Sequence, residues 1–354
     1  MNNGFDVLAA GLACPLPIED EAVVQMAHGG GGRKTAQLIE RVFLPAFRSD
    51  ALEQLGDGAV LTVGNERLAF TTDTFVVQPP FFPGGDIGSL AVHGTANDLA
   101  MCGAEPLGFS VGLVLEEGFA IADLQRIVAS IAAASARVGA PVVTGDTKVV
   151  DRGKGDGIYV NTSAIGRVRA GVTVGPERAA PGDVILVSGP VGDHGIAVMA
   201  ARNGIALETE LLSDSAPVLF LVRALLDAVP QTKVLRDPTR GGLATALCEI
   251  AAASRVGMRI DEGAVPVRRE VRGACELLGF DPLYVACEGR FMAIVPAASA
   301  ERALAALRAL PDGADTTRIG EVTNGDAGRV LLRTRIGSHR RLERLSGEQL
   351  PRIC

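Results

Sequence analysis

Five aspartates recur along the chain, most of them beside a glycine or at the end of an expected strand. They are Asp57, Asp73, Asp98, Asp146 and Asp237. Mg²⁺ prefers carboxylate oxygens and substrate phosphates, and phosphoryl transfer needs it to neutralise charge on a γ-phosphate. The recurrence therefore predicts a magnesium site that serves phosphoryl transfer, although a single Asp next to Gly is also ordinary turn and capping chemistry.

A run of glycines near the start, His28-Gly29-Gly30-Gly31-Gly32-Arg33, offers a second candidate site. It is not a Walker A loop, because that motif needs Gly directly before its Lys, where this chain has Arg33. Consecutive glycines can still present backbone N–H groups to phosphate. The alternative is a flexible loop.

Cys354 follows an arginine-rich stretch that has no hydrophobic period from about Gly337 onward. We therefore expect an exposed cysteine on a mobile tail, where its thiolate could act as a nucleophile. The alternative is an incidental terminal cysteine. Prenylation is excluded, because a C-a-a-X site needs three residues after the cysteine.

Lys148 and Glu288 remain ambiguous on sequence alone. Lys148 could pair with phosphate or be a surface cation, and Glu288 could be a general base or a solvated turn residue. The four histidines have no metal-ligand spacing, so we predict no histidine metal site.

The elements that must position these residues alternate between helices and strands, which predicts an α/β layer in each half of the chain. Periodicity breaks down in residues 171–181, where we place a domain boundary. The expected helices are 36–43, 88–101, 121–138 and two that begin near 195 and 240; the expected strands are 59–63, 68–72, 141–146, 183–189, one before Asp237 and a last one at 291–295.

Composition limits the class of protein. A chain of 354 residues predicts two domains, and 47% hydrophobic with 21% charged residues predicts a cytoplasmic globular protein without a membrane span. A net charge of −7 and the absence of Trp argue against nucleic acid as a partner. The six widely spaced cysteines form no C-x-x-C pair, so most should be reduced, buried thiols.

Several segments resemble the HypE family of NiFe hydrogenase maturation proteins, within the superfamily of aminoimidazole ribonucleotide synthetase and selenophosphate synthetase. The resemblance runs from about His28 to Cys354. It implies an α+β (mixed α/β), two-domain fold with an N-terminal extension (1–24), an ATP-binding and dimerisation domain (25–170), a C-terminal α/β domain (171–336) and a flexible tail (337–354). The segments that carry it are 81–88, 94–98, 144–150, 187–195 and 351–354.

The resemblance also implies roles for particular residues. Cys354, Glu288 and Lys148 become candidates for catalysis. ATP and Mg²⁺ are the implied cofactors, and Asp57, Asp73, Asp98 and Asp237 become candidate metal ligands. The implied ATP-binding residues are Gly30, Gly31, Asp57, Asp73, Asp98, Asp146 and Asp237.

The implied activity is ATP-dependent dehydration of an S-carbamoyl group on Cys354 to S-cyanocysteine, which supplies cyanide to the hydrogenase iron. The implied partners are the carbamoyltransferase HypF, a HypC–HypD complex and a second copy of the chain. Two alternatives stay open: another enzyme of the superfamily, such as selenophosphate synthetase or thiamine monophosphate kinase, and a non-catalytic nucleotide-binding scaffold.

Overall fold

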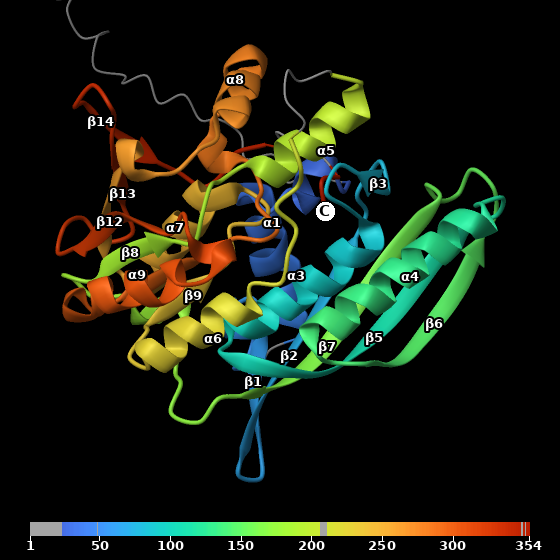
Figure 1. Cartoon of the computed structure of the whole chain (residues 1–354), viewed down its shortest axis with the longest axis horizontal. Coiled ribbons are helices and arrows are strands. Elements are labelled where there is room, and N and C mark those ends of the chain that lie inside the picture. The colour runs from blue at the N-terminus through green and yellow to red at the C-terminus, as the bar shows by residue number, and fades with distance from the viewer. Residues whose placement is uncertain (1–22, 48, 206–210, 348–349, 351) are drawn as a thin grey trace, which may run out of the picture.

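Two large β-sheets with packed helices organise the residues that this computed structural model describes, 23–47, 49–205, 211–347, 350 and 352–354 (Figure 1). This agrees with the predicted mixed α/β fold. The predicted N-terminal extension lies outside the described residues except for Val23 and Val24. No helix of the described part is long and apolar enough to cross a membrane.

The first sheet has five strands in the order β1-β2-β7-β5-β6. Neighbours are antiparallel except for β5 and β6, which are parallel. Two helices cover one face: α3 (Ile87–Met101) packs on the sheet, and α4 (Ile121–Val138) packs on α3. The strands are β1 (Ala59–Val63), β2 (Glu66–Phe75), β5 (Ala104–Glu116), β6 (Val142–Val150) and β7 (Ile158–Val168).

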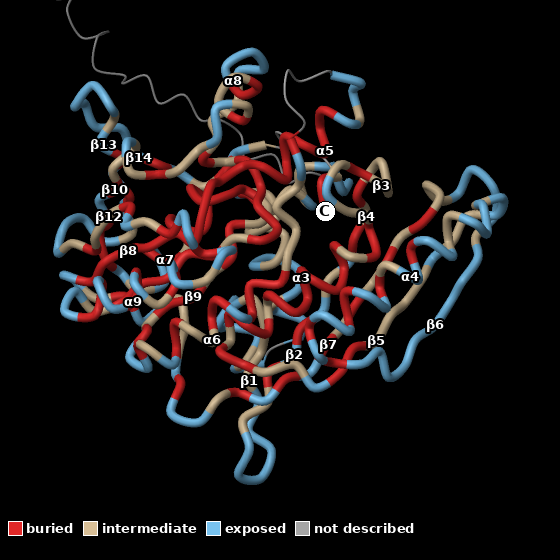
Figure 2. The backbone as a smooth tube through the Cα atoms, in the orientation of Figure 1, coloured by how far each residue is buried: buried red, intermediate tan, exposed pale blue. Residues whose placement is uncertain are grey.

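The other face of the first sheet is open. Phe70 of β2 lies opposite Ile165 of β7, and both side chains are exposed despite being apolar. The edge strand β6 is exposed over nearly its whole length, as the pale blue tube in Figure 2 shows. Apolar side chains that point from a sheet into solvent mark a surface suited to a partner.

The second sheet has seven strands in the order β14-β13-β10-β12-β8-β11-β9. Along β8, Val184 and Leu186 face one apolar cluster, with α6 and α9, while Ile185 and Val187 face another, with α7. This alternation is the period of a strand buried on both faces. The strands are β8 (Val184–Val187), β9 (Val234–Arg236), β10 (Gly257–Asp261), β11 (Met292–Val295), β12 (Thr317–Thr323), β13 (Val330–Arg333) and β14 (His339–Leu342).

Helices of the second half flank this sheet or lie beside it, and one of them reaches α3. α6 contacts α3, so one buried apolar cluster runs from Phe109 of β5 through Leu99 and Leu225 to Leu186. The two halves therefore share a core. The helices are α5 (Asp193–Asn203), α6 (Leu219–Ala228), α7 (Gly242–Ser254), α8 (Arg269–Leu278) and α9 (Ala300–Arg308).

Local chemistry fixes the start of α3, the helix that carries Asp98. Asp86 is its N-cap, and the Asp86 carboxylate accepts hydrogen bonds from Gly88 N (2.7 Å) and Ser89 N (3.0 Å). Such caps satisfy backbone donors that a helix start leaves unpaired. A two-stranded ribbon, β3 (Phe81–Phe82) and β4 (Gly85–Asp86), leads into this cap.

Two expectations about the elements need correction. The strand predicted to be last, which is β11, is followed by β12, β13 and β14, and β14 lies inside the stretch predicted to be an unpatterned tail. The helix predicted at 36–43 exists within a longer helical segment made of α1 (Arg33–Leu38), η2 (Ile39–Phe43) and α2 (Leu44–Phe47).

The cysteine prediction is confirmed for most thiols. Cys248, Cys275 and Cys287 are buried free thiols, and Cys102 is partly buried. Cys14 lies outside the described residues.

Candidate active site

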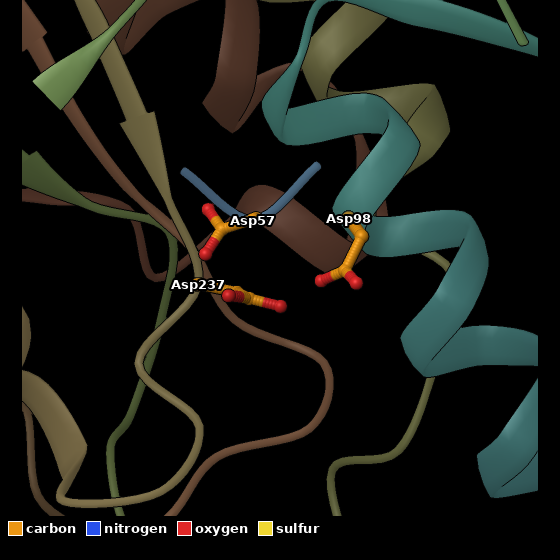
Figure 3. A group of neighbouring side chains, drawn as sticks. All are labelled: Asp57, Asp98 and Asp237. Carbon is orange, nitrogen blue, oxygen red and sulfur yellow. The ribbon is translucent and has the colours of Figure 1, made fainter. Parts of the chain in front are cut away.

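Three aspartates from separate segments point toward one another where the two halves of the fold meet (Figure 3). Asp57 precedes β1, Asp98 lies near the end of α3, and Asp237 directly follows β9. One oxygen from each carboxylate lies within 4.8 Å of the other two. Oxygens that share one Mg²⁺ lie at most about 4.2 Å apart, since each Mg–O distance is about 2.1 Å. The group therefore fits one such cation after a small side-chain adjustment.

Asp73, near the end of β2, adds a fourth carboxyl group, which lies close enough to Asp98 for the two groups to shift each other's pKa. Thr71 Oγ1 donates to Asp98 Oδ2 over 2.6 Å and so fixes its orientation. We call Asp57, Asp73, Asp98 and Asp237 the acidic cluster. The structure brings these four predicted metal residues together; that they hold Mg²⁺ stays a prediction.

Crowding and burial make the acidic cluster costly to ionise. Burial, opposed by Arg236, raises the pKa of Asp57 to about 6. For Asp98 and Asp237, burial and then the neighbouring carboxylates raise the pKa well above 3.8. Carboxylates that repel one another in a poorly hydrated place favour a bound cation, because the cation offsets both effects.

Arg236 is a residue that sequence reasoning missed. Its guanidinium donates to Asp57 Oδ1 (2.6 Å) through Nη1 and to Glu249 Oε2 (2.9 Å) through Nη2. This fork ties β9 and α7 of the second half to the Asp57 segment of the first half. Its position directly before Asp237, a predicted site residue, was the sequence signal that could have identified Arg236.

Glu288 lies beside the acidic cluster and is only 3% exposed. Its Oε1 has no hydrogen-bond partner among the described residues. Burial, followed by the charges of Asp237, Asp214 and Asp73, raises its pKa well above 4.5, while Arg240 opposes the shift. The structure thus places Glu288 in the site and rejects the solvated-turn alternative. An unpaired buried carboxyl group is suited to proton transfer.

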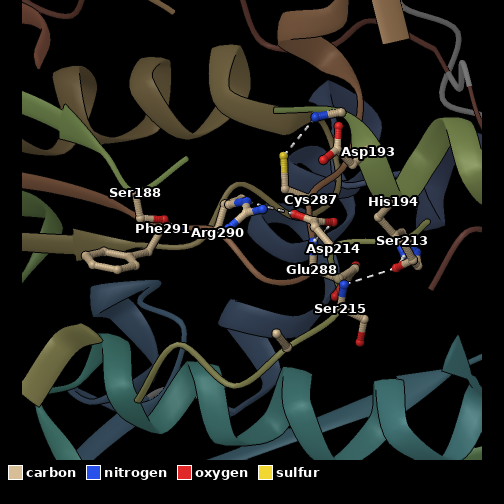
Figure 4. Close-up of polar contacts among 12 residues, drawn as sticks. Ser188, Asp193, His194, Ser213, Asp214, Ser215, Cys287, Glu288, Arg290 and Phe291 are labelled. Atoms are coloured by element: carbon tan, nitrogen blue, oxygen red, sulfur yellow. Dashed lines mark hydrogen bonds and ion pairs between the residues drawn. The ribbon is translucent and has the colours of Figure 1, made fainter. Parts of the chain in front are cut away.

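A second buried network holds the turn that carries Glu288 (Figure 4). Glu288 N donates to Asp214 Oδ1 over 3.2 Å, and Arg290 Nε lies 3.7 Å from Asp214 Oδ2. The Asp214 side chain is fully buried. Asp214 lies in a loop without an obvious motif, so no sequence pattern pointed to it.

The structure contradicts the expectation that Cys354 is exposed: the residue is 8% exposed. Ile353 and Leu350 pack with the large apolar cluster, which draws the end of the chain inward. Burial raises the pKa of the Cys354 thiol to about 12, although the adjacent Arg240 guanidinium opposes this shift. The sequence-based expectation failed because apolar residues too few to show a period can still fill a groove.

Backbone hydrogen bonds dock the last residues against the segment after β2. Val76 N donates to Cys354 O (3.1 Å), and Gln78 N donates to Arg352 O (3.2 Å). His194 Nε2 lies 2.5 Å from Ile353 O, within hydrogen-bond distance, and Arg202 Nη2 donates to Arg352 O. Residues 352–354 are therefore held by hydrogen bonds to their backbone. We call this arrangement the docked tail.

Arg240, another missed residue, contacts the sulfur itself. Its Nε lies 3.0 Å from Cys354 Sγ. Arg240 stands where the sequence predicted only the start of a helix, and its position three residues after Asp237 was the signal that could have identified it.

The glycine-rich segment, which we define as Gly29 to Arg33, lies against Arg240 and the C-terminal residues. Gly29 and Gly30, together with Arg240, Leu345 and Ile353, line a cavity of about 400 Å³. Gly31 has a φ of +72°, a backbone conformation that favours glycine. The segment is thus at the site, although phosphate binding by Gly30 and Gly31 remains a prediction.

The structure does not bring Asp146 and Lys148 to this site. Both lie on the exposed strand β6, where Lys148 Nζ pairs with Asp146 Oδ2 over 2.6 Å. The hydrogen bond from Lys148 lowers the pKa of the Asp146 carboxyl. Asp146 lies opposite Gly112, which itself lies opposite Asn161, so these residues share a row of the first sheet.

The fold defines the class of two-domain proteins related to AIR synthase. The family model described as "AIR synthase related protein, N-terminal domain" matches residues 55–168, and "AIR synthase related protein, C-terminal domain" matches residues 180–333. Within this class the chain belongs to the HypE family of carbamoyl dehydratases.

The similarity to that family is extensive. "Carbamoyl dehydratase HypE" of Cupriavidus necator is 52% identical over 332 residues, which cover 94% of this chain and 95% of that protein. A HypE crystallised with HypF has a TM-score of 0.83 at 44% identity, over 87% of this chain and 99% of that chain. A HypE crystallised with ATP has a TM-score of 0.79 at 46% identity, over 94% and 100%.

Proposed function

We propose that this chain uses ATP to dehydrate an S-carbamoyl group on Cys354 to S-cyanocysteine, as a source of cyanide for the iron of NiFe hydrogenases. The observation that carries the proposal is the position of the Cys354 sulfur. It lies 3.0 Å from Arg240, and the charges of Glu288 and Asp73 act on its thiol. A carrier sulfur, a buried base and an acidic cluster therefore share one site.

ATP is needed because an amide oxygen is a poor leaving group and phosphate is a good one. The carbamoyl oxygen attacks the γ-phosphorus, and ADP leaves. The C–O bond then breaks, phosphate departs with the carbamoyl oxygen, and both N–H protons are lost as the nitrile forms. The products are S-cyanocysteine, ADP and phosphate, so no free water is released.

The acidic cluster would hold Mg²⁺. When bound, Mg²⁺ supplies positive charge that offsets the charge of the triphosphate. The residues fit this group, since their carboxylate oxygens converge and their pKa values are raised by burial and mutual repulsion. The HypE crystallised with ATP supports nucleotide binding in this family.

Glu288 would take the N–H protons. A general base must be ionised, whereas burial and then the charges of Asp237, Asp214 and Asp73 raise the Glu288 pKa in the free site. Neutralising Asp237 and Asp73 would remove part of this shift, so a loaded site would favour the ionised base. The docked tail also excludes water, which would otherwise hydrolyse the activated carbamoyl group.

A second copy of the chain would complete the site. The open face of the first sheet carries exposed apolar side chains, including Phe70 and Ile165, and an unpaired edge at β6. A partner that covers this face would shield the apolar surface. Asp146 and Lys148 lie on the same strand edge, so pairing would carry them to the partner's site rather than to their own.

HypF and a HypC–HypD complex are the proposed donor and acceptor of the one-carbon group. The HypE in the HypE–HypF crystal structure, 44% identical, supports the first of these. Cys354 would have to leave the docked tail to meet either partner, because in the docked position its sulfur is buried.

Intact-mass analysis tests the function. After incubation with a carbamoyl donor and Mg-ATP, the wild-type chain should gain the mass of one carbamoyl group and then lose the mass equivalent of one water, with both changes mapping to Cys354. Cys354→Ala should show neither change and should still bind Mg-ATP. Modification that persists in Cys354→Ala, or ATP binding without any nitrile in the wild type, would favour the scaffold alternative.

A further inference from the structure

Arg240 lies at a tight turn that directs its side chain into the site. Arg240 lies between Asp237 and the start of α7, and the two residues that follow have φ values of +79° and +62°. Both are glycines, as such a turn requires. A Cβ on Gly241 would lie 2.5 Å from Thr245 Oγ1, so the turn has no room for another residue type.

From this turn the guanidinium reaches two segments that are far apart in the chain. Nε donates to Cys354 Sγ (3.0 Å), and Nη2 donates to Cys354 O (3.4 Å). Nη1 donates to Gly29 O (2.5 Å) in the glycine-rich segment. Arginine is suited to this, because its planar fork of donors can serve several acceptors in fixed directions.

The glycine-rich segment is shaped to receive both Arg240 and the C-terminal residues. A Cβ on Gly31 would lie 2.5 Å from Arg240 Cβ, and a Cβ on Gly32 would lie 2.3 Å from Leu345 O. Arg33 N donates to Leu345 O over 2.8 Å. The segment therefore closes on Arg240 and on the residues that lead to the docked tail.

The other contacts of the docked tail involve its backbone and the side chains of Arg352 and Ile353: Arg352 pairs with Asp156 and donates to Val76 O, and Ile353 packs in the large apolar cluster. His194, Arg202 and Val76 contact carbonyl oxygens of residues 352–354. Those contacts hold the chain without a hydrogen bond to the Cys354 sulfur, which packs at the edge of the large apolar cluster. Within the part of the chain that the structure describes, the hydrogen bond from Arg240 is the one that reaches Sγ.

We propose that Arg240 is a positioning residue that fixes the Cys354 sulfur relative to Glu288, and that it does so only while the glycine-rich segment is closed upon it. Docking of the tail and closure of the glycine-rich segment on Arg240 then occur together. The proposal rests on the proposed function only in taking Cys354 as the reacting cysteine. Because the carbamoyl carbon is bonded to that sulfur, the position of Sγ sets the approach of the carbamoyl group to the base.

Protection of Cys354 from alkylation tests the proposal without the reaction. The unmodified full-length chain, free of ATP and donor, is treated with N-ethylmaleimide, and labelling of Cys354 is followed by peptide mass analysis. Arg240→Gln should be labelled roughly 10- to 100-fold faster than wild type, the factor expected for one lost hydrogen bond to a charged group. Arg240→Lys should also be faster, since a single ammonium group cannot serve all three acceptors.

Two further variants make the result specific. Gly31→Ala should also accelerate labelling, because its Cβ would displace Arg240 without changing its charge. The double variant should be labelled more slowly than the product of the two single effects predicts, since both changes break the same contact. Arg341→Gln, an exposed arginine of the C-terminal residues, is the matched control and should be labelled like wild type.

Wild-type protection in Arg240→Gln, equal acceleration in Arg341→Gln, or independent effects in the double variant would each overturn the proposal. If circular dichroism shows that Arg240→Gln does not fold, the labelling rates of Arg240→Lys and Gly31→Ala test the proposal instead. A kinetic readout separates positioning from mere stability: Arg240→Lys should slow single-turnover nitrile formation at saturating ATP and leave the KM for ATP unchanged. If the wild type forms no nitrile, the proposed function is wrong. The alkylation results still show whether Arg240 holds the Cys354 sulfur.

Discussion

Asn97 on α3 donates from Nδ2 to the carbonyl oxygen of Glu288 over 3.1 Å, across a separation of 191 positions in the chain. Its Nδ2 also donates to Ala216 O (3.1 Å), and its Oδ1 accepts from Val218 N (2.8 Å). Asn97 is 1% exposed and directly precedes Asp98 of the acidic cluster. One amide thus fixes the candidate base relative to the candidate metal site.

Asn97→Ala should lower the free energy of unfolding by about 2–4 kcal/mol, because an unsatisfied buried polar group costs about 1–3 kcal/mol and three partners lose their contact. Urea unfolding measures this. Asn203→Ala is the matched control, since among the residues that the structure describes its side chain hydrogen-bonds to Met199 O alone, within the last turn of α5. Equal losses in the two variants would show that Asn97 is an ordinary polar residue.

Gly289→Ala should be among the most damaging single-methyl changes in the chain. The added Cβ would lie 1.8 Å from Asp214 O, a backbone atom in the loop that holds Glu288. Overpacking of this kind costs typically 1–3 kcal/mol and displaces the backbone. Gly273→Ala, in α8 with nothing within 4 Å, should instead be neutral or slightly stabilising. Thermal unfolding of the two variants checks the contrast.

Mg²⁺ should stabilise the folded chain through the acidic cluster. With Mg²⁺ at about 100 times its dissociation constant, the gain is roughly 2.7 kcal/mol for one site. Asp98→Asn should remove most of this gain, because it removes a charge from the middle of the cluster. Melting temperatures with and without Mg²⁺, with Ca²⁺ for comparison, measure it. An undiminished Mg²⁺ effect in Asp98→Asn would place the metal elsewhere.

Lys148 should act on the site of a partner copy. A mixture of Lys148→Ala and Glu288→Gln chains should then recover activity that neither has alone, since each mixed dimer contains one intact site. Random mixing restores roughly a quarter of the sites. Nitrile formation after mixing and subunit exchange measures the recovery. If the mixture stays inactive although mixed dimers form, Lys148 works within its own chain or not at all.

Asp193 should make stability fall as pH rises. Its carboxyl pairs with Arg268 Nε (2.7 Å), yet burial raises its pKa to about 6. A folded-state pKa above the usual 3.8 means that the stabilising contribution is complete below about pH 4 and is lost as pH rises through 6. Relative to Asp193→Asn, the wild type should lose roughly 2.4 kcal/mol between pH 4 and pH 7. Urea unfolding across this range tests it, and parallel pH profiles would contradict it.

Local patterns predicted some elements well and others poorly. The helices α3 and α4 and the strand β1 were predicted almost to the residue, because their apolar spacing and flanking turns are local signals. The central strands β5 and β7 were not predicted. Pro106, Gly108 and Gly112 break the apolar pattern of β5, and neighbouring strands supply the packing that holds it in the sheet.

The sequence by itself determined the mixed α/β class, the aspartates at strand ends and the kinship that singled out Glu288, because these depend on neighbouring residues or on motifs read in order. Only the tertiary structure decided that Asp57, Asp98 and Asp237 converge, and that Asp146 and Lys148 lie on an outer strand. It also decided that Arg240 contacts the sulfur of a buried Cys354. The physical reason is that these relationships join segments tens to hundreds of residues apart, and no local period along the chain records which segments pack together.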